Sequence, residues 1–243
     1  MTEPNQPRNR PQAGPLHDPH DSRDTPSTDL ASWRPRLAAL AGGAGGGDGA
    51  HDANHLERVW RNAQALLARH PQADALVVMA ACYLHDLVNL PKDDPDRAQA
   101  SRRSARLARH QLAVMNFPPE RLDAVAHAIE AHSFSADIPA ETLEAKIVQD
   151  ADRLDALGAV GLARMFYTAG RMGSGLAHPS DPLATGRPLD DRAYSLDHIQ
   201  AKLATLPGRM QTEGGRALAR ERMAMLESFR SAFAEEWGAG KSS

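Results

Sequence analysis

The dipeptide His-Asp occurs four times in this chain of 243 residues. The four pairs are His17-Asp18, His20-Asp21, His51-Asp52 and His85-Asp86. Only the last pair stands in a strongly apolar stretch, AACYLHDLVNL, whereas the others lie in proline-rich or glycine-rich surroundings. An ionised carboxylate in an apolar element needs an opposite charge or a metal ion as its partner. His85 and Asp86 are therefore candidate metal ligands.

Two further ligands are expected from other segments. His55 lies on the shoulder of an apolar helical stripe, one turn before Val59, where its side chain can reach inward. The segment IVQDADRLDALGAVG, residues 147–161, offers three aspartates. On a helical projection Asp150 lies about 60° from the centre of the apolar face, Asp155 about 80° away on the other side, and Asp152 about 140° away. This projection predicts Asp150 as the inward ligand and Asp152 as a solvated surface charge.

Two imidazoles and two carboxylates form a nitrogen–oxygen site without thiolate. Such a site suits Mn²⁺, Mg²⁺, Fe²⁺, Zn²⁺ or Ni²⁺, and we expect one divalent ion, with Mn²⁺ favoured. An ion with open coordination positions binds a phosphate oxygen and makes hydroxide available near neutral pH. The pattern therefore indicates hydrolysis of a phosphate ester or anhydride.

The elements that position these residues are expected to be helices. Apolar residues recur at helical spacing over almost the whole of residues 51–237, and no strand-like alternation is evident. The expected helices are one containing Leu56–Leu67, then 74–90, 97–115, 119–132, 141–169, 194–206 and 214–237, with a loop at 170–192 lying over the site. This is a single all-α bundle of roughly seven helices. Residues 1–50 are expected to be a disordered tail and linker with a short helical patch at 33–40, and 238–243 a flexible C-terminus.

Composition and net charge limit the classes of partner that we expect. The net charge of -3 and the pI near 6.4 give no reason to expect a polynucleotide or an anionic membrane. No apolar run approaches the ~20 residues that span a bilayer. The single cysteine, Cys82, excludes an internal disulfide and is expected to be a small core residue. We expect a cytoplasmic protein with a small-molecule ligand, and a homodimer on base rates alone.

Four sequence blocks together resemble the HD-domain metal-dependent phosphohydrolases. They are HDANHLERV (51–59), LHDLVNLPK (84–92), HSFS (132–135) and IVQDADRLDALGAVGLAR (147–164). The DADRLDALGA block is similar to one subgroup of small bacterial HD hydrolases, and the similarity covers roughly residues 51–237. The resemblance implies an all-helical fold, the metal ligands His55, His85, Asp86 and Asp150, and action on nucleotides or other phosphorylated small molecules.

The chain also departs from parts of this superfamily. Guanosine tetraphosphate hydrolases carry a Glu-Asp pair where this chain has Asn89 and Leu90, which counts against that activity. Two-metal members add histidines, but His127 and His132 would point about 140° apart on one helix. We therefore expect one metal, with His132 near the phosphate as a proton donor or, alternatively, as a structural histidine.

The expected mechanism assigns Asp86 and His132 to catalysis and Lys92, Arg58 and Arg153 to substrate binding. The alternatives are a solvated Lys92 and arginines that pair with Asp155 and other acids. From the resemblance to the small bacterial subgroup, we favour cleavage of a nucleoside triphosphate to monophosphate and pyrophosphate. A nucleotide phosphatase, a cyclic-nucleotide phosphodiesterase, a non-catalytic nucleotide-sensing module and a helical scaffold with a buried polar network are the other readings.

Overall fold

The computed structural model describes residues 28–43, 53–90, 94–133 and 136–238. The expected tail up to residue 27, the linker residues 44–52 with the His51-Asp52 pair, and the C-terminal residues 239–243 lie outside these ranges. Across the described ranges there is one isolated bridge, between Gly175 and Tyr194, and no strand. The prediction of an all-α fold is confirmed. In the same ranges no helix is long and apolar enough to cross a membrane.

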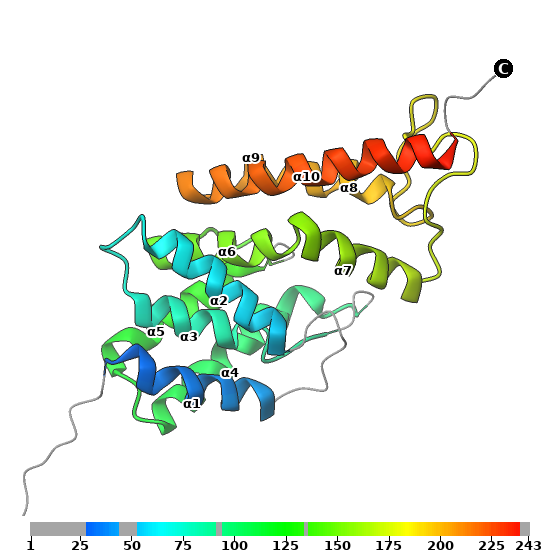
Figure 1. Cartoon of the computed structure of the whole chain (residues 1–243). Coiled ribbons are helices and arrows are strands. Elements are labelled where there is room, and N and C mark those ends of the chain that lie inside the picture. Colours follow the sequence, from blue (N-terminus) through cyan, green and yellow to red (C-terminus); the bar gives the residue numbers. More distant parts are fainter. Residues whose placement is uncertain (1–27, 44–52, 91–93, 134–135, 239–243) are drawn as a thin grey trace, which may run out of the picture.

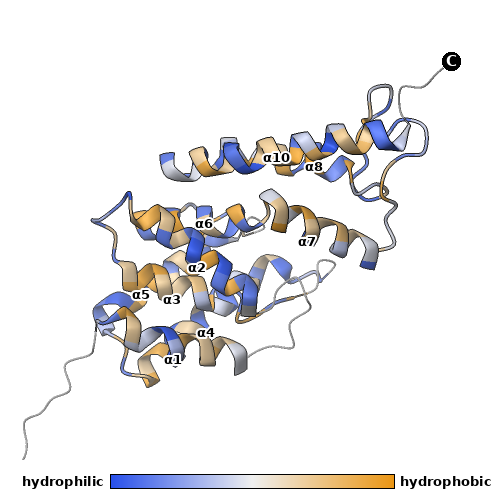
Figure 2. Ribbon diagram, in the orientation of Figure 1, coloured by the Kyte–Doolittle hydropathy of each residue, from blue (hydrophilic) through white to orange (hydrophobic). Residues whose placement is uncertain are grey.

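The central element is α3 (Ala75–Leu84), which is buried from Leu76 to Leu84. A helix that is apolar on every side must be surrounded by other elements. It is packed against α1 (Leu30–Gly43), α2 (Ala53–Leu67), α5 (Leu122–His132) and α6 (Leu143–Asp155) (Figure 1). α4 (Ala100–Val114) packs on α5. Colouring by hydropathy shows α3 as almost entirely apolar (Figure 2). Along α2 and α10 (Glu213–Trp237), apolar and polar residues alternate.

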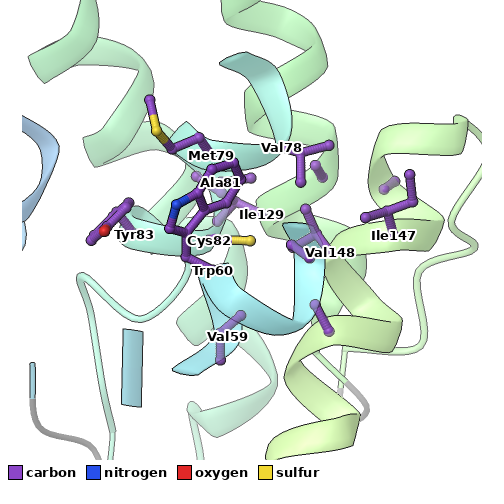
Figure 3. Close-up of a cluster of buried hydrophobic side chains, with 14 of the residues drawn as sticks. Val59, Trp60, Val78, Met79, Ala81, Cys82, Tyr83, Ile129, Ile147 and Val148 are labelled. Atoms are coloured by element: carbon purple, nitrogen blue, oxygen red, sulfur yellow. The ribbon is translucent and has the colours of Figure 1, made fainter. Parts of the chain in front are cut away.

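The side chains around α3 form one core (Figure 3). Trp60 of α2, Ile129 of α5 and Val148 of α6 surround Cys82, which is 0% exposed. Burial raises the pKa of the Cys82 thiol, so this side chain behaves as a small apolar residue. The prediction that Cys82 belongs to the core is confirmed.

The packed part of the chain begins before the boundary expected near His51. In α1, Trp33 and Leu37 lie one helical turn apart and are both buried. The Trp33 ring meets Phe117 edge to face, with centroids 4.9 Å apart. Arg34 Nε donates to the Tyr83 hydroxyl at 3.0 Å, which ties α1 to α3. The short helical patch expected at 33–40 is thus a core helix of 14 residues.

Two expected helices end earlier than predicted. α3 stops at Leu84 rather than at residue 90, because the backbone of Val88 bonds to the side chain of Ser104 instead of to α3. The helix expected over 141–169 is divided into α6 and α7 (Gly158–Arg171). The division falls at Gly158, whose φ of +74° is a left-handed conformation that favours glycine.

The C-terminal region is also more divided than expected. In place of one helix at 194–206 there are α8 (Asp197–Ala201), a short 3₁₀ turn (Leu203–Thr205) and α9 (Leu206–Arg209). The loop before α8 lies against the second half of α10, where Trp237 Nε1 donates to the Pro179 carbonyl at 3.2 Å. Arg230 of α10 donates to the Leu183 carbonyl at 2.6 Å. These contacts place the loop on α10, not over the site as expected.

The first turn of α10 is anchored to α6 by Asp150. The buried carboxylate of Asp150 accepts hydrogen bonds from the Gln211 amide at 2.7 Å, the Thr212 amide at 2.8 Å and the Thr212 hydroxyl at 2.7 Å. The same hydroxyl caps α10 by accepting from the Gly215 amide. Asp150 therefore fastens the last long helix to the rest of the bundle.

This anchor predicts an unusual response to a Gly→Ala change in a helix. Alanine is normally favoured over glycine in a helix by about 1 kcal/mol. A Cβ at Gly215 would lie 2.8 Å from Asp150 Cγ, and the three hydrogen bonds on that carboxylate keep it from moving. We expect Gly215→Ala to lower the free energy of unfolding by about 1–3 kcal/mol. The measurement is equilibrium urea unfolding.

The matched control is Gly170→Ala in α7, where a Cβ meets no atom within 4 Å. This variant should be as stable as the wild type or more stable. Equal stability of the two variants would contradict the close approach of α10 to Asp150.

Candidate metal site

Two histidines from different helices face each other at the centre of the bundle. His55 lies in the first turns of α2, and His85 follows the last residue of α3. Both side chains are buried, with 2% and 1% of their surface exposed. Their Nε2 atoms are 3.3 Å apart, although the chain brings them from positions 30 residues apart.

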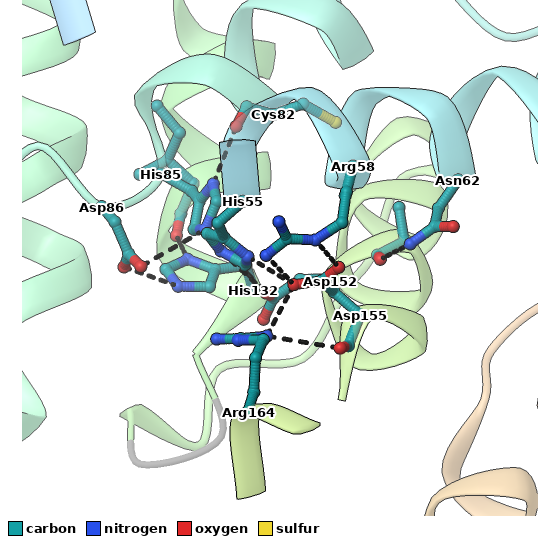
Figure 4. Close-up of polar contacts among 12 residues, drawn as sticks. His55, Arg58, Asn62, Cys82, His85, Asp86, His132, Asp152, Asp155 and Arg164 are labelled. Atoms are coloured by element: carbon teal, nitrogen blue, oxygen red, sulfur yellow. Dashed lines mark hydrogen bonds and ion pairs between the residues drawn. The ribbon is translucent and has the colours of Figure 1, made fainter. Parts of the chain in front are cut away.

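The other ring nitrogen of each histidine has an acceptor. His55 Nδ1 donates to Asp155 Oδ2 at 2.8 Å, and His85 Nδ1 donates to the Cys82 carbonyl at 2.9 Å. His132, the last residue of α5, donates from Nδ1 to the Ile129 carbonyl at 2.6 Å. When these rings are neutral, the acceptors place the proton on Nδ1 and leave a lone pair on Nε2. All three Nε2 atoms face the same region (Figure 4).

Two carboxylates complete this region. Asp152 Oδ1 lies 3.6 Å from His55 Nε2 and 3.9 Å from His85 Nε2. Asp86 Oδ2 lies 3.4 Å from His85 Nε2, and its Oδ1 lies 3.6 Å from His132 Nε2. Each carboxylate side chain is 29% exposed, so the site opens to solvent on the carboxylate side.

The spacing of these atoms fits a bound cation. Ligand atoms at about 2.1 Å from an octahedral ion are about 3 Å apart along an edge and about 4 Å apart across it. The separations of 3.3–3.9 Å fall within that interval. His55, His85 and Asp152 form one group of potential ligands, and His85, Asp86 and His132 form another that shares His85.

Electrostatics at the site also fit a cation. Burial opposes ionisation of Asp86, yet the facing His85 and His132 hold its pKa well below its ordinary value. Burial likewise disfavours a charged His85, but Asp86 and Asp152 raise its pKa to about 9. The carboxylates thus stabilise positive charge at this point. A divalent ion supplies that charge and is coordinated by the Nε2 lone pairs of neutral imidazoles.

Asp150, predicted as the fourth ligand, is not brought to this site. Its carboxylate is turned to the start of α10, where it accepts the three hydrogen bonds described above. Asp152, predicted as a solvated surface charge, is the α6 carboxylate beside His55 and His85. The helical projection failed because α6 is buried on several sides, against α2, α3, α5 and α10, and an inward direction does not distinguish the site from the α10 contact.

Asp155 orients the His55 ring from the side opposite the metal site. Its carboxylate accepts from His55 Nδ1, from Arg58 Nε at 2.7 Å and from Arg164 Nη1 at 2.6 Å. Burial would raise the pKa of Asp155, but the hydrogen bonds from His55 and Arg58 lower it to about 2. Arg58 therefore pairs with Asp155, as one of the two sequence readings expected. Arg164 of α7 was missed, since nothing in its spacing marks it before the turn after α6 is known.

The other residues considered for the site lie in different places. His132 lies beside Asp86, and His127 lies apart, where its Nε2 accepts from the Glu141 amide. Arg153 is directed to the Arg209 carbonyl of α9 and is not brought to the site. Lys92 lies outside the described residues.

Comparison with known proteins gives the family. The family model described as HD domain matches residues 52–157. Protein YpgQ of Bacillus subtilis (strain 168), described as uncharacterized, is 34% identical over 183 residues, which are 74% of this chain and 80% of YpgQ. The chain belongs to the HD-domain family. The resemblance seen in the four sequence blocks is therefore confirmed at the level of the family.

Solved structures of similar proteins have the same fold. A crystal structure of B. subtilis YpgQ in complex with ADP matches with a TM-score of 0.63 and 30% identity, over 85% of this chain and 93% of that one. An HD-superfamily hydrolase from Bacillus thuringiensis matches with a TM-score of 0.67 and 28% identity, over 86% and 98% of the two chains. This HD-domain protein is a hydrolase with a His/Asp site for a divalent metal ion.

The two neighbouring aspartates of α6 give a direct test of the ligand set. Asp152→Asn should weaken binding of a divalent ion by at least about 100-fold, because it removes a charged ligand. Asp150→Asn should leave metal affinity within about threefold and instead lower the free energy of unfolding by about 1–3 kcal/mol, because it weakens the α10 anchor. Metal affinity is measured by competition with a chromophoric chelator. Loss of the metal in the Asp150 variant alone would refute this assignment.

Asp155 should affect both metal affinity and stability. Asp155→Asn removes the acceptor that orients His55, and we expect metal affinity to fall about 10–100-fold. The depressed pKa means that Asp155 stabilises the fold above pH ~4 and that this contribution, on the order of 1–2 kcal/mol, is lost as the pH falls toward 2. The stability of Asp155→Asn should therefore change less than that of the wild type between pH 5 and about 2. Parallel pH profiles of urea unfolding would contradict this role.

Proposed function

We propose that this HD-domain protein is a metal-dependent phosphohydrolase that cleaves a nucleoside triphosphate to monophosphate and pyrophosphate. The observation that carries the proposal is the convergence of Nε2 atoms and two carboxylates at one solvent-open point. His55, His85, Asp86 and Asp152 would hold one divalent ion, with Mn²⁺ favoured. When bound there, such an ion would polarise a phosphoryl oxygen and make a water molecule more acidic.

His132 is the residue best placed to handle a proton. The Ile129 carbonyl keeps the Nδ1 proton in place, so Nε2 is the atom that gains or loses a proton. Protonated Nε2 donates a hydrogen bond to a phosphoryl or leaving oxygen beside Asp86. In the reaction, the water oxygen bonds to the α-phosphorus and the bond from that phosphorus to the bridging oxygen breaks. Pyrophosphate leaves with the bridging oxygen, and one proton is released.

The nucleotide part of the proposal is supported by YpgQ, which crystallises in complex with ADP. A nucleotide phosphatase or cyclic-nucleotide phosphodiesterase would use the same metal site but release different products. A nucleotide-sensing module would bind metal and nucleotide without turnover. Products and metal dependence therefore separate these functions.

The experiment is a panel of ribo- and deoxynucleotides incubated with Mn²⁺, Mg²⁺, Zn²⁺ or a chelator, with release of phosphate and pyrophosphate measured separately. We expect pyrophosphate release from triphosphates with Mn²⁺, and a loss of at least about 100-fold in Asp86→Ala. The control is Asp123→Ala, which removes an exposed carboxylate of α5. Metal-independent release, or equal rates in both variants, would contradict the proposal. Release of phosphate alone would favour the phosphatase.

A further inference from the structure

A small pocket of about 50 Å³ opens beside the metal site. Asp86 and His132 form the wall that it shares with the site. Its other walls include Asn89, which follows α3, Arg97 in the 3₁₀ turn (Arg97–Gln99) before α4, and Ser101 in the first turn of α4. A group bound in this pocket would therefore lie next to a group bound at the metal.

The start of α4 is joined to the segment after α3 by two side chains. Ser104 Oγ accepts a hydrogen bond from the Val88 amide at 3.0 Å. Arg97 Nη1 donates to the Leu90 carbonyl. Both contacts hold the segment that carries Asn89 against α4, so the pocket is bounded by hydrogen-bonded backbone.

Ser101 lies one turn before Ser104, but its hydroxyl makes no comparable hydrogen bond. It is 2% exposed, lines the pocket, and its hydroxyl has no hydrogen-bond partner among the described residues. A buried hydroxyl without a partner is unfavourable, and native structures rarely keep one without a reason. The unpaired hydroxyl indicates a polar ligand in the pocket.

Apart from the metal-site carboxylate of Asp86, the charges around the pocket favour an anion. Ser101 stands in the first turn of α4, a helix of 15 residues whose N-cap Gln99 makes no side-chain capping bond. The N-terminus of a helix of this length carries partial positive charge. The Ala100 amide already donates to the Arg97 carbonyl of the preceding 3₁₀ turn. Arg97 adds a full charge and pairs with no carboxylate among the described residues, and only one of its donors is used by Leu90.

We propose that this pocket binds the phosphoryl group adjacent to the one held at the metal. Ser101 Oγ donates to a non-bridging oxygen, and Arg97 and the start of α4 balance its charge. The substrate then carries at least two phosphoryl groups in succession, which selects phosphoanhydrides over monoesters and cyclic esters. This inference rests on the proposed function, and it names the feature of the substrate that the site recognises.

The test measures binding of two uncleavable probes to the Mn²⁺-loaded full-length protein by calorimetry. Methylenediphosphonate carries two phosphonate groups and methylphosphonate carries one, and blank titrations into Mn²⁺ alone subtract chelation. Wild type should bind the diphosphonate at least about tenfold more tightly than the monophosphonate. Ser101→Ala and Arg97→Gln should each weaken binding of the diphosphonate about tenfold. Binding of the monophosphonate should change by less than about twofold.

Matched controls remove the same groups elsewhere. Ser228→Ala deletes an exposed hydroxyl of α10, and Arg106→Gln deletes an exposed charge of α4. Both should bind the diphosphonate as the wild type does. Ser101→Ala should fold normally, because it removes an unpaired hydroxyl and no contact.

Two results would overturn the inference. In the first, Ser101→Ala and Arg97→Gln bind the diphosphonate as tightly as their control variants do. In the second, the two substitutions weaken binding of both probes equally. The first would mean that the pocket holds water only. Because the titration needs no turnover, failure of nucleotide hydrolysis with intact diphosphonate selectivity contradicts the proposed function and not the subsite. Hydrolysis that is insensitive to both variants, with no selectivity, overturns the subsite and not the function.

Discussion

Unprotonated imidazole nitrogens and carboxylates held within 4 Å of one another repel unless positive charge lies between them. In this protein the Nε2 atoms of His55 and His85 are 3.3 Å apart, with Asp86 and Asp152 beside them. The surrounding helices prevent the rings from turning away, because each Nδ1 is bound to a fixed acceptor. A positive charge at this point, either a proton on His85 or a bound metal ion, therefore stabilises the arrangement, and the all-helical bundle keeps the side chains in place.

Three carboxylates within six residues of α6 have three different roles. Asp150 fastens α10, Asp152 faces the metal site, and Asp155 orients His55 and is held by Arg58 and Arg164. A second tie joins the same helices, since Arg222 of α10 donates to the Leu154 carbonyl and to Asn62, which itself donates to the Ala151 carbonyl. The stability of the bundle and the geometry of the site thus depend on neighbouring residues of one helix.

The sequence predicts the two histidines at the centre of the site. His55 could be identified because it stands beside an apolar helical stripe, and His85 because it stands with Asp86 in a strongly apolar stretch. The all-α fold follows from helical periodicity. Asp152 could not be chosen over Asp150, because α6 is buried on several sides and only the packed structure shows which side holds the histidines. Arg164 and Ser101 were likewise beyond reach, since their positions depend on the turn at Gly158 and on the loop fastened to Ser104.

The most direct measurement is anomalous diffraction from crystals of the full-length protein grown with Mn²⁺. The predicted result is one strong peak within about 2.5 Å of His55 Nε2, His85 Nε2 and carboxylate oxygens of Asp86 and Asp152. A peak coordinated by Asp150, or no peak among these four residues in a protein that holds stoichiometric Mn²⁺, would contradict the account.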